Sequence, residues 1–127
     1  ERETGFRDRE AQVIAELCEG DRLIVALGGG AILREENRQM ITRQGLTIWL
    51  QASPQTLYNR ISSDPSTSEN RPNLSAVGGE REIHDLLGHR LPLYQTCADL
   101  EVDTENQTPQ QVAHDILPLV FNHFGLP

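Results

Sequence analysis

The sequence contains no lysine, and all 11 of its basic residues are arginines. This absence excludes, within these 127 residues, a lysine that forms a Schiff base and the lysine of a nucleotide-binding P-loop. Acidic residues outnumber basic ones by 19 to 11, which gives a formal net charge of −8. Such a chain lacks the basic surface that nucleic acids and anionic membranes require, so an anionic ligand needs a local cluster of arginines.

Cysteines are scarce, and long apolar runs are missing. Cys18 and Cys97 are far apart and fit no metal-binding or redox spacing, so we expect reduced thiols and a cytoplasmic protein. No apolar stretch is long enough to span a membrane, and no signal-peptide pattern is visible. His84 and His89 are five residues apart, do not share a helix face, and have no carboxylate cluster nearby. We therefore predict no metal site within these residues.

The most distinctive stretch is an apolar run that ends in three glycines. Residues 23–27 read Leu-Ile-Val-Ala-Leu and predict a strand that is buried on both faces, as in parallel sheets. Gly28, Gly29 and Gly30 follow at once, and glycine allows backbone N–H groups to approach a ligand closely. Open α/β sheets bind ligands at the carboxyl ends of their strands, where this turn is expected. A tight strand-to-helix turn without a ligand is the alternative interpretation.

Helical and strand patterns alternate along the rest of the chain. We predict a first helix that is capped by Thr4 and ended by Gly20, and a second helix over 34–43. A third helix is predicted after a cap at Ser53, and a fourth over 82–89, which residues 90–94 close. The last helix is predicted after a capping box at Thr108. Further strands are predicted over 46–50 and 100–103, and a long polar loop over 62–80. This alternation implies a parallel α/β sheet with helices on its faces, although three strands are few for such a sheet.

Several arginines stand in specific local patterns. Arg7 and Glu10, three residues apart, can pair on a helix surface. The chain contains Gly5-Phe6-Arg7-x-x-Glu10, Ala26-Leu27-Gly28-Gly29-Gly30-Ala31, Arg71-Pro72, Arg90-x-Pro92-Leu93-Tyr94 followed by Ala98-Asp99, and Val102-Asp103-Thr104. In this order and spacing, the motifs resemble the shikimate kinase family, and the resemblance covers essentially the whole chain.

The resemblance implies a fold and a substrate site. The implied fold is α/β, a parallel-sheet, three-layer α/β/α arrangement like that of P-loop kinases. Arg7 resembles the helix arginine that holds the carboxylate of shikimate, and Arg90 resembles a second substrate arginine. Gly29, between Gly28 and Gly30, resembles the glycine whose backbone contacts the substrate.

The nucleotide side of the resemblance is incomplete. Arg71 resembles the catalytic lid arginine that closes over the phosphates of ATP, and Gln107 lies where the family has a residue beside the adenine. The family's P-loop motif, GxxxxGK[ST], and the Asp-bearing segment after it are absent. The chain does not begin with Met, so we expect both upstream of Glu1, with the main groups for ATP and Mg²⁺. The P-loop strand is implied between residues 23–27 and the strand around Trp49, and its absence leaves two strand edges unpaired.

These observations predict one partial kinase domain over 1–127, with a substrate-binding helix region over 1–22, a lid loop over 62–80 and a core from the remainder. The implied function is ATP-dependent phosphorylation of the shikimate 3-hydroxyl in chorismate and aromatic amino-acid biosynthesis. Shikimate is the implied partner, with no nucleic acid and no membrane. We expect the intact protein to be a monomer. We expect the fragment alone to self-associate and to be inactive without the P-loop.

The alternatives are a non-catalytic kinase remnant that binds a small anion or a partner chain, and a relative such as a gluconate kinase.

Overall fold

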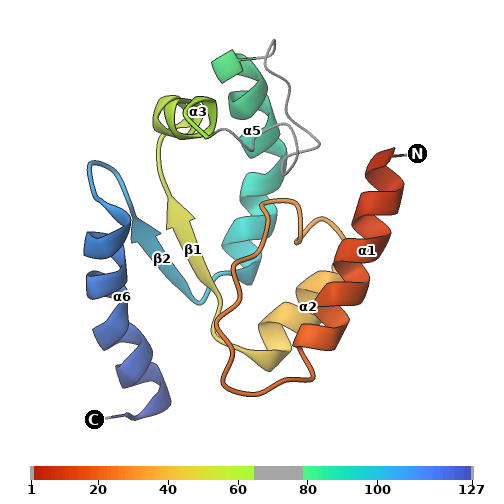
Figure 1. Ribbon diagram of the computed structural model, residues 1–127, viewed down its shortest axis with the longest axis vertical. Helices are drawn as coiled ribbons and strands as arrows, with labels where there is room; N and C mark the ends of the chain where they lie inside the picture. The colour runs from red at the N-terminus through yellow and green to blue at the C-terminus, as the bar shows by residue number, and fades with distance from the viewer. Residues whose placement is uncertain (1, 65–78, 127) are drawn as a thin grey trace.

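Two parallel strands form the sheet of the molecule. The computed structural model describes residues 2–64 and 79–126 (Figure 1). Within these ranges β1 (Ile48–Gln51) pairs with β2 (Leu100–Asp103) in parallel. The register sets Ile48 beside Leu100 and Gln51 beside Asp103. The predicted mixed α/β class is confirmed. The strand predicted over 46–50 begins and ends slightly later in the chain, as β1.

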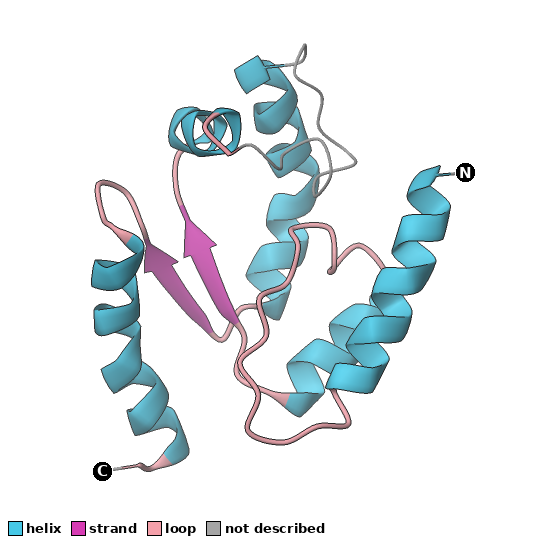
Figure 2. Ribbon diagram, in the orientation of Figure 1, coloured by secondary structure: helices cyan, strands magenta, loops and turns pink. Residues whose placement is uncertain are grey.

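Helices pack around this sheet (Figure 2). They are α1 (Arg2–Leu17), α2 (Glu35–Gln44), α3 (Pro54–Ser62), α5 (Gly79–Cys97) and α6 (Pro109–Phe124). α1 packs on α2, α2 on α5, and α3 on α5. In Figure 1, α6 and the α1–α2 pair lie on opposite sides of the two strands. No helix in the two described ranges is long and apolar enough to cross a membrane.

Two of the predicted helix starts are confirmed by their hydrogen bonds. The Ser53 hydroxyl oxygen accepts from the Thr56 N–H at 3.2 Å, and α3 begins at a proline. The Thr108 hydroxyl oxygen accepts from the Gln111 N–H at 3.1 Å, while Oε1 of Gln111 accepts from the Thr108 N–H at 2.9 Å. This reciprocal pair is the predicted capping box. The predicted Thr4 cap is wrong, because α1 already begins at Arg2.

The predicted strand over residues 23–27 is not formed. These residues lie in the irregular segment between α1 and α2 and pair with neither strand of the sheet. Ile24 is fully exposed, and Leu23 is 53% exposed. An apolar run indicates that side chains need burial, but a strand also needs a neighbour that accepts its backbone hydrogen bonds. The described residues provide no such neighbour beside this segment.

The α5 helix is longer than predicted. It runs from Gly79 to Cys97 and includes Pro92, so the expectation of a helix over 82–89 closed by residues 90–94 is wrong. An internal proline removes one backbone hydrogen bond and crowds the preceding turn. Burial of Ile83 and Cys97 near the two ends of the helix favours its continuation. Arg90 and Tyr94 therefore lie four residues apart on one helix face.

The helix bounds also narrow the predicted polar loop. α3 includes residue 62, and α5 begins at residue 79, so the two ends of the 62–80 segment are helical. Residues 65–78 lie outside the described residues.

Burial is uneven across the described residues. The buried apolar side chains are Ile14, Ala31, Ile32, Ile83, Cys97 and Val112. Most of them come from α1, α5 and the turn before α2, which places the core near the glycines. Toward its end α6 instead exposes Leu117, Leu119, Phe121 and Phe124, each between 41% and 57%. Burial also raises the pKa of the free Cys97 thiol.

The capping box at Thr108 predicts a measurable contribution to stability. We expect Thr108→Ala to lower the free energy of unfolding by about 1 kcal/mol, because it removes one half of the reciprocal pair. Urea denaturation of the protein expressed from its complete gene measures this difference. Thr96→Ala is the control, since the Thr96 hydroxyl donates within α5 to the Pro92 carbonyl and alanine favours helix. Equal losses in the two variants would contradict the capping role.

Candidate anion-binding site

Arg7 on α1 is a buried arginine that contacts the glycine turn. Its side chain is 10% exposed, and its Nη1 donates to Oε1 of Glu10 at 2.6 Å. The predicted pair is confirmed, and it is largely shielded from solvent because the Glu10 side chain is only 14% exposed. A Cβ atom added at Gly30 would overlap with the guanidinium of Arg7. Glycine at this position therefore makes room for the arginine head group.

Arg90 and Tyr94 reach the same turn from α5. A Cβ at Gly29 would lie 3.0 Å from Nη1 of Arg90 and 3.0 Å from the hydroxyl oxygen of Tyr94. The Tyr94 hydroxyl donates a hydrogen bond of 2.7 Å to the Gly29 carbonyl oxygen. Its ring packs on Trp49 of β1, with 5.5 Å between ring centroids. Tyr94 thus connects the sheet, α5 and the glycine turn.

The residues that follow the glycines are held by α2. Nδ2 of Asn37, which is 2% exposed, donates to the Ala31 carbonyl at 3.0 Å. Nη1 of Arg38 donates to the carbonyl oxygens of Ile32 at 2.8 Å and Leu33 at 3.0 Å. These side-chain donors satisfy backbone carbonyls of an irregular segment. The turn is therefore held in place even though no strand precedes it.

Two guanidinium groups consequently meet at consecutive glycines. Arg7 lies at Gly30, and Arg90, which is 7% exposed, lies at Gly29. A guanidinium presents a planar fork of N–H donors that can bind a carboxylate through both oxygens, and it stays charged at any working pH. This arrangement suits a small carboxylate whose other polar groups face the backbone of the turn. The predicted substrate residues that the structure brings together are Arg7, Gly28, Gly29, Gly30 and Arg90.

A second polar cluster joins α3 to the turn between β2 and α6. The Glu105 carboxylate accepts from the Ser53 N–H at 3.2 Å, from the Ser53 hydroxyl at 2.9 Å and from the Thr56 hydroxyl. Arg60, one turn further along α3, donates to the hydroxyl and to the carbonyl of Thr104, both at 2.9 Å. The hydrogen bonds from Thr56 and Ser53 lower the pKa of Glu105 below its usual value near 4.5, and the charge of Arg60 acts in the same direction.

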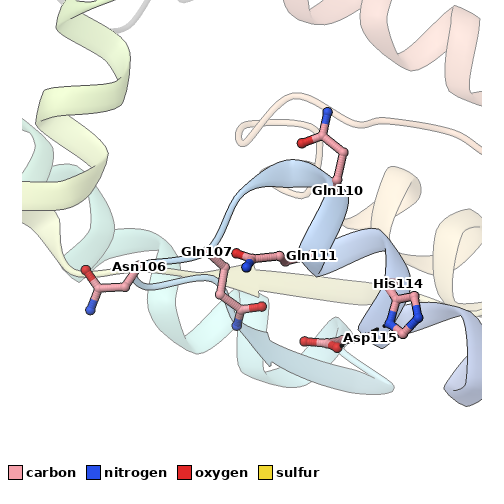
Figure 3. Close-up of a pocket in the computed structure, with 6 residues that line it drawn as sticks. All are labelled: Asn106, Gln107, Gln110, Gln111, His114 and Asp115. Carbon is pink, nitrogen blue, oxygen red and sulfur yellow. Dashed lines mark ion pairs between the residues drawn. The ribbon is translucent and has the colours of Figure 1, made fainter.

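Gln107 lies apart from the two arginines. It lines an open pocket of about 450 Å³ at the start of α6, and none of the predicted substrate residues lines that pocket. Its Nε2 donates to the Asp103 carbonyl at 2.8 Å. Figure 3 shows the lining side chains on α6 and on the turn before it: Asn106, Gln107, Gln110, Gln111, His114 and Asp115. The pocket is rich in amide groups, which can donate and accept hydrogen bonds.

The aspartates near the sheet have structural partners, as strand-end and turn roles predict. Oδ2 of Asp99 accepts from the Thr47 N–H at 2.7 Å, and Oδ1 of Asp103 accepts from the Glu105 N–H at 2.8 Å. Among residues 2–64 and 79–126, no three His, Cys, Asp or Glu side chains form a group that could hold a metal ion. Arg71, the predicted lid arginine, lies outside the described residues.

The fold and the site define a class: a mixed α/β protein in which two buried arginines face a glycine turn. The family model for shikimate kinase matches residues 1–120. The shikimate kinase of Rhodopirellula baltica is 38% identical over 125 residues, which cover 98% of this chain and 67% of that protein. The shikimate kinase of Pseudomonas fluorescens is 44% identical over 117 residues, which cover 92% and 66%. A solved structure, shikimate kinase from Acinetobacter baumannii in complex with shikimate, matches with a TM-score of 0.85 and 32% identity.

The chain belongs to the shikimate kinase family. The match with the Acinetobacter baumannii structure covers 95% of this chain and 65% of that one. The chain therefore spans about two-thirds of the length of the relatives that it matches.

Two contacts in these clusters were not predicted. The sequence alone does not indicate the hydroxyl bond of Tyr94 to Gly29, which depends on α5 continuing through Pro92. Its spacing of four residues from Arg90 was the available signal. Glu105 had no local signal, because its partners Ser53 and Thr56 lie 52 and 49 residues away in the chain.

The overlap at Gly30 predicts that even one methyl group disrupts the site. We expect Gly30→Ala to displace the Arg7 guanidinium and to lower the free energy of unfolding by about 1–3 kcal/mol, because the added methyl group has no room beside it. Urea denaturation of the protein expressed from its complete gene measures this difference. Gly45→Ala is the matched control, because a Cβ there meets no atom within 4 Å. Equal stabilities of the two variants would show that the Gly30 contact does not position Arg7.

The lowered pKa of Glu105 predicts a pH dependence of stability. The unfolded chain takes up this proton first as the pH falls, since the folded-state pKa lies below 4.5. The stabilisation by the carboxylate is therefore complete above about pH 4.5 and is lost as the pH falls through the lower value. We expect stability to fall less steeply with acidification in Glu105→Gln than in the wild type. Glu101→Gln, on the neighbouring strand, is the control for the loss of one charge, and identical pH profiles in all three proteins would refute the assignment.

Proposed function

We propose that this chain provides the shikimate-binding part of an ATP-dependent kinase that phosphorylates the 3-hydroxyl of shikimate. The observation that supports this proposal is the meeting of Arg7 and Arg90 at Gly29 and Gly30. Both arginines are less than 10% exposed, so their charges lie within the molecule, close to the turn. A buried cation is costly without an anionic partner, and Glu10 provides one for Arg7. A substrate carboxylate is a fitting partner for the pair of arginines.

Shikimate has the chemistry that this site favours. It is a small, rigid carboxylate with three hydroxyl groups. The two guanidinium forks hold its carboxylate, and the exposed Gly28 and Gly29 leave their backbone open to its hydroxyls, whereas Gly30 is buried against Arg7. The Tyr94 hydroxyl bond to the Gly29 carbonyl limits how far that peptide group can rotate. The Acinetobacter baumannii relative, which matches over 95% of this chain, was solved with shikimate.

The reaction transfers the γ-phosphoryl group of ATP to the oxygen of the 3-hydroxyl. A bond forms between that oxygen and the γ-phosphorus, the bond from phosphorus to the β,γ-bridging oxygen breaks, and ADP and a proton leave. Phosphoryl transfer depends mainly on positioning and on stabilisation of charge. In this proposal Arg7 and Arg90 position the acceptor, and the pocket at Gln107 takes the nucleotide base. Arg71 keeps its predicted role at the ATP phosphates.

The groups that hold the phosphates and Mg²⁺ are assigned to a P-loop segment, since the 127 residues contain no GxxxxGK[ST] motif. The proposal sets the strand of that segment between residues 23–27 and β1. The exposure of Ile24 and of Leu50, which is 54% exposed, supports this position, because both side chains have apolar surface to bury. A non-catalytic remnant that binds a small anion or a partner chain is the second candidate, because two buried arginines at a glycine turn can bind an anion without a nucleotide. Phosphorylation of shikimate by the protein expressed from its complete gene distinguishes the two.

Removing either arginine tests the substrate assignment. We expect Arg7→Ala and Arg90→Ala each to raise the dissociation constant for shikimate by about 10- to 100-fold, because each removes charge-assisted hydrogen bonds of roughly 1.5–3 kcal/mol. Calorimetric titration of the protein expressed from its complete gene measures the effect.

Arg43→Ala is the matched control, because Arg43 is an exposed arginine in the last turn of α2. It should bind shikimate as the wild type does. Wild-type affinity in the Arg7 and Arg90 variants would exclude both residues from the site. Tighter binding of gluconate than of shikimate by the wild type would instead favour a gluconate kinase.

A further inference from the structure

The turn between β2 and α6 carries both Glu105 and Gln107, two residues apart. It is tight: the Gln107 N–H donates to the Thr104 carbonyl at 3.2 Å, and Asn106 has a positive φ of 57°. Asparagine adopts this left-handed conformation more readily than most residues. A displacement of Glu105 in so short a turn is therefore passed on to Gln107.

This turn is attached to β1 and to α3, and Thr104 contacts both, since its hydroxyl and its carbonyl also accept from Arg60 of α3 at 2.9 Å. Thr104 ties it to the end of β1, because its N–H and its hydroxyl both donate to the Gln51 carbonyl at 2.8 Å. Glu105 ties it to the first turn of α3 through Ser53 and Thr56. The Thr104 contacts fix where the turn begins, and the Glu105 contacts fix the part that leads to the pocket.

We propose that Glu105 is a positioning residue for the pocket at Gln107: by binding the first turn of α3, its carboxylate fixes the turn of residues 104–107 and so the orientation of the Gln107 side chain. The inference rests on the proposed function, which assigns this pocket to the nucleotide base. Glu105 itself does not line the pocket. Its Oε1 accepts from Ser53 and its two oxygens accept from Thr56, so it acts through the turn rather than on the ligand.

The proposal predicts a selective loss of nucleotide affinity when the contact of Glu105 with the first turn of α3 is removed, while Arg60 still binds Thr104. A pocket that holds its binding geometry only about a fifth of the time binds its ligand about fivefold more weakly. We therefore expect Thr56→Val and Glu105→Ala each to raise the dissociation constant for MgADP by about five- to tenfold. Both should leave the dissociation constant for shikimate unchanged, because neither residue contacts the glycine turn.

The variants separate positioning from charge and from helix capping. Thr56→Val removes the hydroxyl donor without changing any charge, whereas Glu105→Ala removes the acceptor together with a negative charge whose loss alone would favour an anionic nucleotide. Thr56→Ser keeps the hydroxyl and should bind MgADP as the wild type does. Ser53 is left intact because its hydroxyl also caps α3. Glu101→Gln again controls for a carboxylate lost from the neighbouring strand.

Calorimetric titration of the protein expressed from its complete gene, with MgADP and with shikimate in separate runs, tests the proposal. The double variant Thr56→Val/Glu105→Ala should bind MgADP no more than about twofold more weakly than the weaker-binding single variant, since both changes remove the same Thr56–Glu105 contact. Wild-type MgADP affinity in the single variants, or a parallel loss of shikimate affinity, would overturn the positioning role. A wild type that binds shikimate but no MgADP would overturn the nucleotide part of the proposed function and this inference with it.

Discussion

The contact between the Arg7 guanidinium and the backbone at Gly30 is the constraint on which the candidate site depends. It places a charged group inside the molecule, where an isolated cation is costly. Glu10 offsets part of that cost from one helical turn away, and the absence of a side chain at position 30 supplies the space. The arginine, the carboxylate and the glycine therefore function as one unit, and a change in any of them alters the position of the guanidinium.

The second half of the site depends on the length of α5. Because the helix continues through Pro92, Arg90 and Tyr94 point toward Gly29 from successive turns. Tyr94 also packs on Trp49, so the strand β1 helps to set the position of the glycine turn. Loops often carry binding groups on a rigid scaffold. Here the scaffold supplies the side chains as well, and the loop supplies the backbone between them.

The polar junction at Glu105 and the pocket at Gln107 lie away from this site, on the turn between β2 and α6. The two regions are connected through β1, which packs on Tyr94 at one residue and binds Thr104 at its end. The proposed function assigns the two regions to different ligands, the glycine turn to the acceptor and the pocket at Gln107 to the nucleotide base. Residues 23–27 and α6 expose apolar side chains. The chain spans about two-thirds of the length of its relatives.

Local chemistry in the sequence was sufficient for the family, the α/β class, the Arg7–Glu10 pair and the caps at Ser53 and Thr108. Each of these depends on residues a few positions apart, or on motifs whose order can be read from the sequence directly. The prediction of a strand over 23–27 was wrong, because an apolar run indicates that side chains need burial but does not indicate that a neighbouring strand is present.

Only the tertiary structure decided that α5 passes through Pro92, because burial at the two ends of the helix outweighs the hydrogen bond that proline removes. It alone revealed the bond from Tyr94 to Gly29 and the junction from Glu105 to α3. Their partners lie 65 and 52 residues apart in the chain, so the fold brings them together and no local pattern records them.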